Sequence, residues 1–267
     1  MHPTFQRIAC MAIASLCVSA HALTMGVTEG VTYKATDSEI EARFEGIEKA
    51  ISVATKQPVK IVVYSKYNAL RDALKSGAVD FAFIHPTHVA LEAIQSGNYK
   101  AMAWTAGFTE YKVSLLCKEA AEPIKNWSSV SGKAMVMPDA DSITSVMTRA
   151  MLKENGLKPA DVRVQNTRYQ DAVPFYVENN FSVYGATASN GVIKAWKEKG
   201  GKTCAESRAM PIKQWVVSSG LAPSTASAVR DALLGMEGAA LGSSGYKKFV
   251  APSSEQEKSL IAWLGIH

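Results

Sequence analysis

The sequence predicts an α/β protein made of two lobes, in which two mainly parallel sheets are flanked by helices and joined by two inter-lobe crossings. Short apolar, β-branched runs alternate with amphipathic stretches along the chain, a pattern typical of βαβ units. Two short connections, at 107–111 and 210–214, lie where this alternation changes and divide the chain into a first segment, an inserted middle and a return. We therefore expect lobe 1 at 23–108 and 214–267, and lobe 2 at 109–213.

The first 22 residues are expected to be a signal peptide rather than part of the fold. Arg7 precedes an apolar, small-residue run, and a small-x-small cleavage site (AHA) occupies residues 20–22. A lipoprotein anchored at Cys17 is the alternative. No later stretch has the ~18 to 20 apolar residues that a spanning helix needs. We expect an exported mature protein that begins at Leu23 and is long enough for two cores.

Nine segments combine the length of a strand with enrichment in β-branched or other apolar residues. In chain order they are 24–28, 60–64, 79–84, 101–104, 112–117, 134–137, 162–165, 182–186 and 215–218. Helical patterns separate them, and the first, about 38–54, carries one apolar stripe and can be capped by residues 36–38. That stripe consists of Ile40, Phe44, Ile47 and Ile51.

The remaining helices are placed by the signals at their ends. The second is expected to have Asn68 as its N-cap and to end at Gly77, which suits the left-handed C-terminal position. The third begins at Pro86 or Thr87, and the fourth follows Ser142 and ends at the Asn-Gly pair. Later helices are expected after Tyr169, Ser189 and Ser224.

Cysteine usage predicts one disulfide. Two of the four cysteines leave with the signal peptide, so the mature chain keeps Cys117 and Cys204. In an oxidising compartment we expect this pair to be bonded, and two buried free thiols are the alternative. Neither cysteine belongs to a CxxC motif or a histidine cluster, so neither a metal site nor a catalytic thiol is predicted.

Charge and motifs argue against two classes of function. The formal net charge is +5 and the charges are interspersed, which predicts no nucleic-acid partner and fits either an anionic ligand or simple solubility. The sequence has no G-x-S-x-G, Walker, Rossmann or H-E-x-x-H motif. We therefore expect a monomeric binding protein without a cofactor. An exported enzyme is the alternative, because catalytic residues converge in space rather than in sequence.

Three segments, in order, resemble a known family. Residues 67–83 (YNALRDALKSGAVDFAF) are similar to its tyrosine, helix, "sGxvD" and strand pattern. Residues 137–145 (MPDADSITS) are similar to its "dPxSxTSG" loop, and residues 171–173 (DAV) lie where it carries "HxxAv". The chain thus resembles the phosphate, phosphite and phosphonate substrate-binding proteins of ABC importers. The resemblance implies a type II-like periplasmic binding protein that closes on a small oxyanion and delivers it to the importer's membrane subunits.

The start of the fourth helix is the first candidate site. Ligands of α/β sheets bind beyond the carboxyl ends of the strands, and a helix start offers unpaired N–H groups and the positive end of a dipole. Ser142, Thr144 and Ser145 add hydroxyl donors there, and the resemblance makes them the expected contacts of phosphoryl oxygens. The alternative is that Ser142 is only an N-cap.

Lobe 1 supplies further candidates. Tyr67 matches the family's ligand-contacting tyrosine, although a half-buried tyrosine at a helix start is the alternative. His85 and Thr87 follow the third strand, beside a second helix start. His85 and His88 could instead bind a metal ion, but no third ligand is evident, so no metal is predicted. Glu29 and Tyr33, after the first strand, are also within reach of the expected cleft.

The sequence departs from the family at two points. The family's "HxxAv" histidine is replaced by Arg168, Tyr169 or Gln170, depending on the alignment offset. Arg168 could grip an oxyanion with two hydrogen bonds, or be an ordinary surface arginine. The family's acidic site residues fall near Ser182, Ser189 or Asn190. Asp139 and Asp141 would oppose a dianion unless they point away or cap the helix.

Two further functions are compatible with the same fold. One is a ligand sensor for a membrane receptor. The other is binding of a sulfonate, a vitamin precursor or an amino-acid-like ligand.

Overall fold

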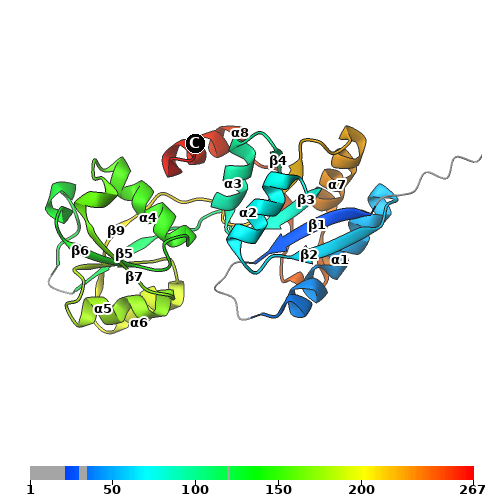
Figure 1. Ribbon diagram of the computed structural model, residues 1–267. Coiled ribbons are helices and arrows are strands. Elements are labelled where there is room, and N and C mark those ends of the chain that lie inside the picture. The colour runs from blue at the N-terminus through cyan, green and yellow to red at the C-terminus, as the bar shows by residue number, and fades with distance from the viewer. Residues whose placement is uncertain (1–21, 30–34, 119–120) are drawn as a thin grey trace, which may run out of the picture.

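The computed structural model describes residues 22–29, 35–118 and 121–267, which form two lobes joined by two connecting segments (Figure 1). The expected signal peptide lies outside the described residues, apart from Ala22. Within the described ranges, no helix has the length and apolar character needed to cross a membrane.

Lobe 1 has, among the described residues, a six-stranded sheet in the order β11-β4-β10-β3-β1-β2. Its strands are β1 (Leu23–Thr28), β2 (Val59–Val63), β3 (Phe81–Ile84), β4 (Tyr99–Thr105), β10 (Gln214–Ser218) and β11 (Phe249–Val250). β1 pairs in parallel with β2 and β3. β10 lies between β3 and β4 and runs antiparallel to both, and β11 runs antiparallel to β4.

Helices cover both faces of this sheet and give it two cores. The helices are α1 (Asp37–Thr55), α2 (Tyr67–Ser76), α3 (Thr87–Gln95) and α7 (Pro223–Gly235), and a 3-10 helix, η4 (Gly238–Ser244), follows α7. The predicted stripe of α1 is buried against one face together with Trp215, around which Phe44 and Phe83 pack. On the other face, α2 and α3 pack through Leu70 and Val89.

Lobe 2 has, within the described ranges, a five-stranded sheet in the order β7-β6-β8-β5-β9. Its strands are β5 (Ser114–Cys117), β6 (Ala134–Met137), β7 (Arg163–Asn166), β8 (Tyr184–Thr187) and β9 (Lys202–Glu206). β6 pairs in parallel with β7 and β8, whereas β5 runs antiparallel to β8 and β9. Its helices are α4 (Ile143–Glu154), α5 (Val173–Glu178) and α6 (Asn190–Glu198), with 3-10 turns η1 (Trp127–Val130), η2 (Pro159–Asp161) and η3 (Gln170–Ala172).

The predicted two-lobed α/β architecture is confirmed, and both sheets prove to be mixed rather than mainly parallel. All nine predicted strands form, while β9 and β11 were not predicted. Helix α2 begins two residues earlier than predicted, since Lys66 and not Asn68 is its N-cap. Tyr67 is buried and Asn68 is exposed, so packing of the tyrosine outweighs the capping preference of asparagine. Gly77 ends α2 with φ 71°, as predicted.

The two segments that connect the lobes run antiparallel, side by side. Ile212 N–H donates to Phe108 O at 3.0 Å, and Tyr111 and Met210 exchange backbone hydrogen bonds of 3.2 and 3.0 Å. The chain leaves the lobe 1 sheet after Thr105 and re-enters it at Gln214. Rotation about a few residues of these segments would change the angle between the lobes.

The last helix, α8 (Ser254–Leu264), contacts both lobes. Its Leu260 and Trp263 are buried in one core with Leu91 of α3 and Met147 of α4. Trp263 Nε1 also donates to Glu154 Oε2 at 2.9 Å. The return segment, expected to belong to lobe 1, therefore ends at the junction of the two lobes, because the apolar face of α8 needs both surfaces to be covered.

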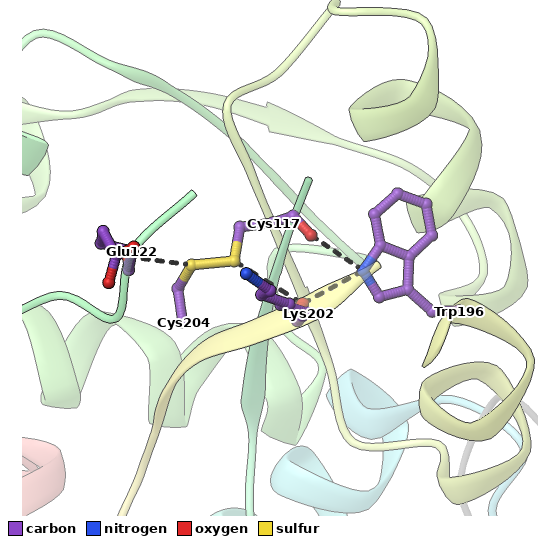
Figure 2. The surroundings of a disulfide bond; sticks show 5 residues. All are labelled: Cys117, Glu122, Trp196, Lys202 and Cys204. Atoms are coloured by element: carbon purple, nitrogen blue, oxygen red, sulfur yellow. Dashed lines mark hydrogen bonds between the residues drawn. A yellow bond between two sulfur atoms is a disulfide. The ribbon is translucent and has the colours of Figure 1, made fainter. Parts of the chain in front are cut away.

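The predicted disulfide is present between Cys117 of β5 and Cys204 of β9, with Cα atoms 6.0 Å apart (Figure 2). Both cysteines are buried. Trp196 Nε1 lies beside the bond and donates to the backbone oxygens of Cys117 and Lys202, each at 3.1 Å. The disulfide therefore ties an edge strand of lobe 2 into its sheet.

Candidate functional site

The starts of α2, α3 and α4 come together at the junction between the lobes. Arg71 of α2 donates to the Asp141 carboxylate, just before α4, at 2.6 and 3.0 Å. Tyr111, on the first connecting segment, lies with its hydroxyl 3.1 Å from Thr144 Oγ1 of α4. β3 leads into α3 and β6 leads into α4, so this junction lies beyond the carboxyl ends of strands, where α/β proteins bind their ligands. It is the candidate site.

Ser142 is the N-cap of α4. Its backbone is extended (φ −69°, ψ 147°) and its Oγ accepts the N–H of Ser145 at 3.2 Å. The expected capping role is therefore present, and it leaves the hydroxyl proton of Ser142 available to a ligand. The first N–H groups of any α-helix have no acceptor inside the helix, so this end also attracts an anion.

Thr144 and Ser145 are both buried at the same helix start, but their hydroxyls have different surroundings. Thr144 Oγ1 faces the connecting segment through Tyr111. Ser145 Oγ donates to Pro138 O at 3.1 Å and so holds the loop that precedes the helix. Of these two hydroxyls, that of Thr144 contacts a connecting segment, whereas that of Ser145 is engaged within its own loop.

Asp141 links this helix start to lobe 1. Arg71 also donates to the Glu92 carboxylate of α3 at 2.6 and 3.0 Å, so one guanidinium bridges two carboxylates. Burial alone would raise the pKa of Asp141, but the nearby His88 ring, together with the hydrogen bonds and charge of Arg71, outweighs burial and lowers that pKa well below its usual range. From the sequence, the Asp141 carboxylate was expected to repel a bound anion. In the structure its charge is balanced by Arg71 of lobe 1.

Tyr67 lies next to this ion pair. It is the first residue of α2, it is buried, and its ring meets His88 edge to face with centroids 6.1 Å apart. His88 Nε2 in turn lies 3.5 Å from Asp141 Oδ1. Asp139 points into its own loop, where its Oδ1 accepts the Asp141 N–H at 2.9 Å.

His85 and Thr87 occupy the end of β3 and the start of α3. His85 Nδ1 is 2.8 Å from Glu29 O, and burial, followed by the charge of Lys213, lowers the pKa of His85 to about 3, so its ring is neutral at pH 7. Thr87 N–H donates to Ile212 O at 3.1 Å, while Thr87 Oγ1 has no hydrogen-bond partner among the described residues. The described part of the chain contains no group of three or more potential metal ligands.

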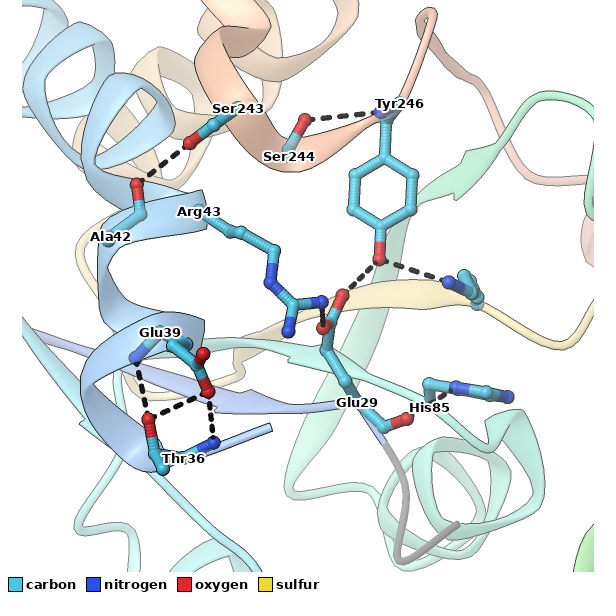
Figure 3. Close-up of polar contacts among 10 residues, drawn as sticks. Glu29, Thr36, Glu39, Ala42, Arg43, His85, Ser243, Ser244 and Tyr246 are labelled. Atoms are coloured by element: carbon cyan, nitrogen blue, oxygen red, sulfur yellow. Dashed lines mark hydrogen bonds and ion pairs between the residues drawn. The ribbon is translucent and has the colours of Figure 1, made fainter. Parts of the chain in front are cut away.

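A buried polar cluster at the end of β1 was not predicted as a unit. Arg43 of α1 donates to Glu29 Oε2, and the Tyr246 hydroxyl donates to Glu29 Oε1 at 2.7 Å (Figure 3). Lys213 Nζ donates to the same hydroxyl at 3.1 Å and lies 4.3 Å from the centre of the Phe108 ring. The signal in the sequence was a single lysine at the edge of a buried apolar strand, in MPIKQWVV. The other candidate named beyond β1, Tyr33, lies outside the described residues.

Arg168 and Tyr169 follow β7 on the lobe 2 side of the junction. Both are exposed, and the Arg168 guanidinium lies 5.1 Å from the centre of the Tyr169 ring. Ser189 is the N-cap of α6, where its Oγ accepts the Val192 N–H at 3.4 Å. These three residues lie at the carboxyl ends of β7 and β8, the strands that flank β6 in the sheet.

Gln170 is more closely tied to the fold than its two neighbours. Its Oε1 accepts the Thr187 hydroxyl at 2.9 Å and the Ala188 N–H at 2.6 Å. It thereby joins η3 to the end of β8. Of the three residues that could stand in the place of the family's histidine, it is the one that the structure holds in a hydrogen-bonded position beside β8.

Comparison with known proteins agrees with this architecture. A sequence model of the family described as "ABC transporter, phosphonate, periplasmic substrate-binding protein" matches residues 30–256. The fold is similar to that of XAC2383 from Xanthomonas citri bound to ATP, with a TM-score of 0.72, 14% identity, and coverage of 91% of this chain and 97% of that chain.

Two phosphonate-related structures are similar as well. PhnD1 from Prochlorococcus marinus in complex with methylphosphonate has a TM-score of 0.66 at 14% identity, covering 92% of this chain and 99% of that chain. A binding protein component of an ABC phosphonate transporter (PA3383) from Pseudomonas aeruginosa has a TM-score of 0.60 at 16% identity, covering 91% and 85%. At these sequence identities the structural similarity shows only that the fold is shared.

Proposed function

Because the chain belongs to the phosphonate-type periplasmic substrate-binding proteins of ABC transporters, we propose that it captures a small phosphorus oxyanion between its two lobes. Membership of this family makes it a periplasmic transport component with a membrane transporter as partner, rather than an enzyme. Phosphonate, phosphite and phosphate are the proposed ligands. The proposal includes a signal peptide at 1–22, lobe boundaries within the two connecting segments, and a monomeric protein.

The start of α4 is the observation that carries this proposal. A tetrahedral oxyanion placed there would meet the first N–H groups of the helix together with the hydroxyls of Ser142 and Thr144. The adjacent carboxylate of Asp141 is balanced by Arg71, so it does not oppose the anion at full strength. Tyr67 and Thr87 would contribute hydroxyl groups from lobe 1, and Arg168, Tyr169 and Ser189 would reach the ligand on closure.

Such a site is strong enough for uptake from dilute solution. A hydrogen bond to a charged group contributes about 1.5 to 3 kcal/mol, and about 8 kcal/mol of net binding free energy corresponds to micromolar affinity. Four or five such bonds therefore support a micromolar complex after the entropic cost of association.

A thermal-shift screen tests the ligand class. We expect methylphosphonate, phosphite or phosphate to raise the melting temperature, because a ligand at 100 times its dissociation constant adds about 2.7 kcal/mol of stability. Methanesulfonate and glycine serve as the competing classes. Stabilisation by one of these two, with no response to any phosphorus oxyanion, would reject the proposed ligand.

A double substitution tests the site. Ser142→Gly with Thr144→Val is expected to weaken binding of the best ligand at least tenfold, because it removes both hydroxyl donors. Glycine is chosen because replacing a serine N-cap by glycine costs only a few tenths of a kcal/mol, whereas alanine costs about 1 kcal/mol. The measurement is isothermal titration calorimetry on wild-type and variant protein.

The matched control is Ser253→Gly. Ser253 caps α8 through the same contact, its Oγ accepting the Gln256 N–H at 3.2 Å, but it lies away from the start of α4. Its affinity should equal that of the wild type. Equal affinities in all three proteins would remove the α4 start from the site.

A further inference from the structure

Helix α8 lies across the seam between the two lobes (Figure 1). It contacts α3 of lobe 1 and α4 of lobe 2, and its Leu260 and Trp263 are buried in one core with Leu91 of α3 and Met147 of α4. A change in the angle between the lobes moves α3 against α4. Because α8 packs on both helices, it cannot keep all of these contacts when the lobes move.

The N-terminal half of α8 is fastened to lobe 1. Only residues 251–253 separate it from β11, so its start cannot move far from the lobe 1 sheet. Gln214 Nε2 of β10 donates to Glu257 Oε1 at 2.6 Å, and both side chains are buried. Breaking this bond would leave a buried carboxyl group without its donor, which is costly. This half of α8 therefore stays with lobe 1 when the lobes move.

The C-terminal half of α8 is held by lobe 2 through contacts that can separate. Trp263 Nε1 donates to Glu154 Oε2 at 2.9 Å, and Arg208 Nη2 donates to Glu154 Oε1 at 2.6 Å. The Arg208 guanidinium also lies 5.0 Å from the centre of the Trp263 ring. The side chains of Arg208 and Glu154 are 40% and 39% exposed, so water can replace their bonds at little cost. The lobe 2 end is thus where α8 detaches.

We propose that the C-terminal half of α8 is a latch that favours the closed arrangement of the lobes, in which Arg71 contacts Asp141, and that it detaches from lobe 2 when the cleft opens. Detachment exposes the apolar surfaces of Trp263 and Leu260, and their burial therefore stabilises the closed arrangement.

The latch acts at a distance from the candidate site, because Glu154 is the last residue of α4 and the site lies at the first turn of that helix. A ligand that binds only the closed arrangement has an apparent affinity proportional to the closed fraction of the protein. The latch therefore sets affinity for any ligand of the cleft without contacting it.

Glu154→Ala tests the latch, because it removes both acceptors at the lobe 2 end. Alanine is the best helix former, and Glu154 is half-exposed, so the fold should be retained. We expect small-angle X-ray scattering to show a larger radius of gyration for the ligand-free variant than for the wild type. Its affinity for methylphosphonate, measured by calorimetry, should fall about threefold to tenfold, in proportion to the lost closed fraction. Saturating methylphosphonate should restore the wild-type radius.

The matched control is Glu198→Ala. Glu198 is likewise the last residue of a lobe 2 helix, but its cation, Lys194, lies 3.9 Å away on the same helix, α6. This variant should match the wild type in radius and affinity. A second variant, Arg208→Met, removes the ion pair and leaves the bond between Trp263 and Glu154 in place, so both quantities should change in the same direction as in Glu154→Ala, but less.

Wild-type radius and affinity in Glu154→Ala and Arg208→Met would overturn the latch and leave the proposed function intact. A lower melting temperature of Glu154→Ala with an unchanged radius would also overturn it, since the contact would then serve stability alone. The scattering measurement on ligand-free protein does not depend on which ligand binds. A wild type that binds no phosphorus oxyanion would therefore reject the proposed function, while the radius would still decide whether the latch exists.

Discussion

Removing the Cys117–Cys204 disulfide is expected to lower the free energy of unfolding by about 2 to 5 kcal/mol. The two cysteines are 87 positions apart, so the bond closes most of lobe 2 into one loop and strongly restricts the unfolded chain. β9, which it ties to β5, is an edge strand held on one side only. The variant is Cys117→Ala with Cys204→Ala, and the measurement is urea unfolding followed by tryptophan fluorescence.

Measuring stability with and without reductant distinguishes the contribution of the disulfide bond from that of the packing of the two cysteine side chains. Wild type in strong reductant should approach the stability of the double variant, whereas the double variant should be indifferent to reductant. An unfolding midpoint for the double variant equal to that of the oxidised wild type would show that the bond contributes nothing to the stability of lobe 2.

Much of the fold could be predicted because its signals are local. The stripe of Ile40, Phe44, Ile47 and Ile51 is buried as its spacing predicts, and Gly77 and Ser142 end and begin their helices at the expected positions. The nine predicted strands combine short length with apolar or β-branched residues. In each case a few neighbouring residues contain the whole signal.

The errors arise where distant residues decide the structure. β9 reads KTCAE, a polar sequence that becomes a strand because β5 offers it a free edge and Cys117 binds Cys204. β11 has two residues and is defined only by its pairing with β4. The antiparallel direction of β10 follows from the return of the chain through the second connecting segment, which no local pattern records.

The candidate site was predictable in part for the same reason. Ser142 and Thr144 belong to a segment whose sequence resembles a family pattern, and the start of a helix is recognisable from local residues. Lys213 and Arg43 belong to no motif. Arg43 binds Glu29 directly, and Lys213 reaches Glu29 only through Tyr246, which is 217 positions from Glu29 along the chain. The partner of Asp141 could not be predicted either, because Arg71 reaches it from the other lobe.

Replacing Arg71 by methionine is expected to weaken oxyanion binding about a hundredfold, equivalent to about 2.7 kcal/mol. The guanidinium joins the lobes through Asp141, and its loss leaves that carboxylate beside the start of α4 without its cation. Two effects then add: the lobes lose a direct contact, and an uncompensated negative charge faces the anionic ligand. The matched control is Lys75→Met, which removes an exposed charge from the same helix.

The second substitution, Asp141→Asn, separates these two effects. If repulsion by the carboxylate dominates, Arg71→Met with Asp141→Asn should bind more tightly than Arg71→Met alone, because the opposing charge is gone. If the inter-lobe contact dominates, the double variant should be no better than the single one. In the wild type the lowered pKa of Asp141 keeps its carboxylate ionised from pH 5 to 8, and the stabilisation that it provides should be lost only on strong acidification. In Arg71→Met the hydrogen bonds and charge of Arg71 no longer lower this pKa, whereas burial still raises it. Any part of the Arg71→Met deficit that is due to repulsion should therefore be smaller at pH 5 than at pH 8. The measurement is calorimetric titration at pH 5 and pH 8 of the wild type, Arg71→Met, Lys75→Met and the variant with both Arg71→Met and Asp141→Asn. It separates the loss of the inter-lobe contact from the repulsion by the carboxylate. A wild-type affinity in Arg71→Met would show that the ion pair plays no part in closure or in ligand binding.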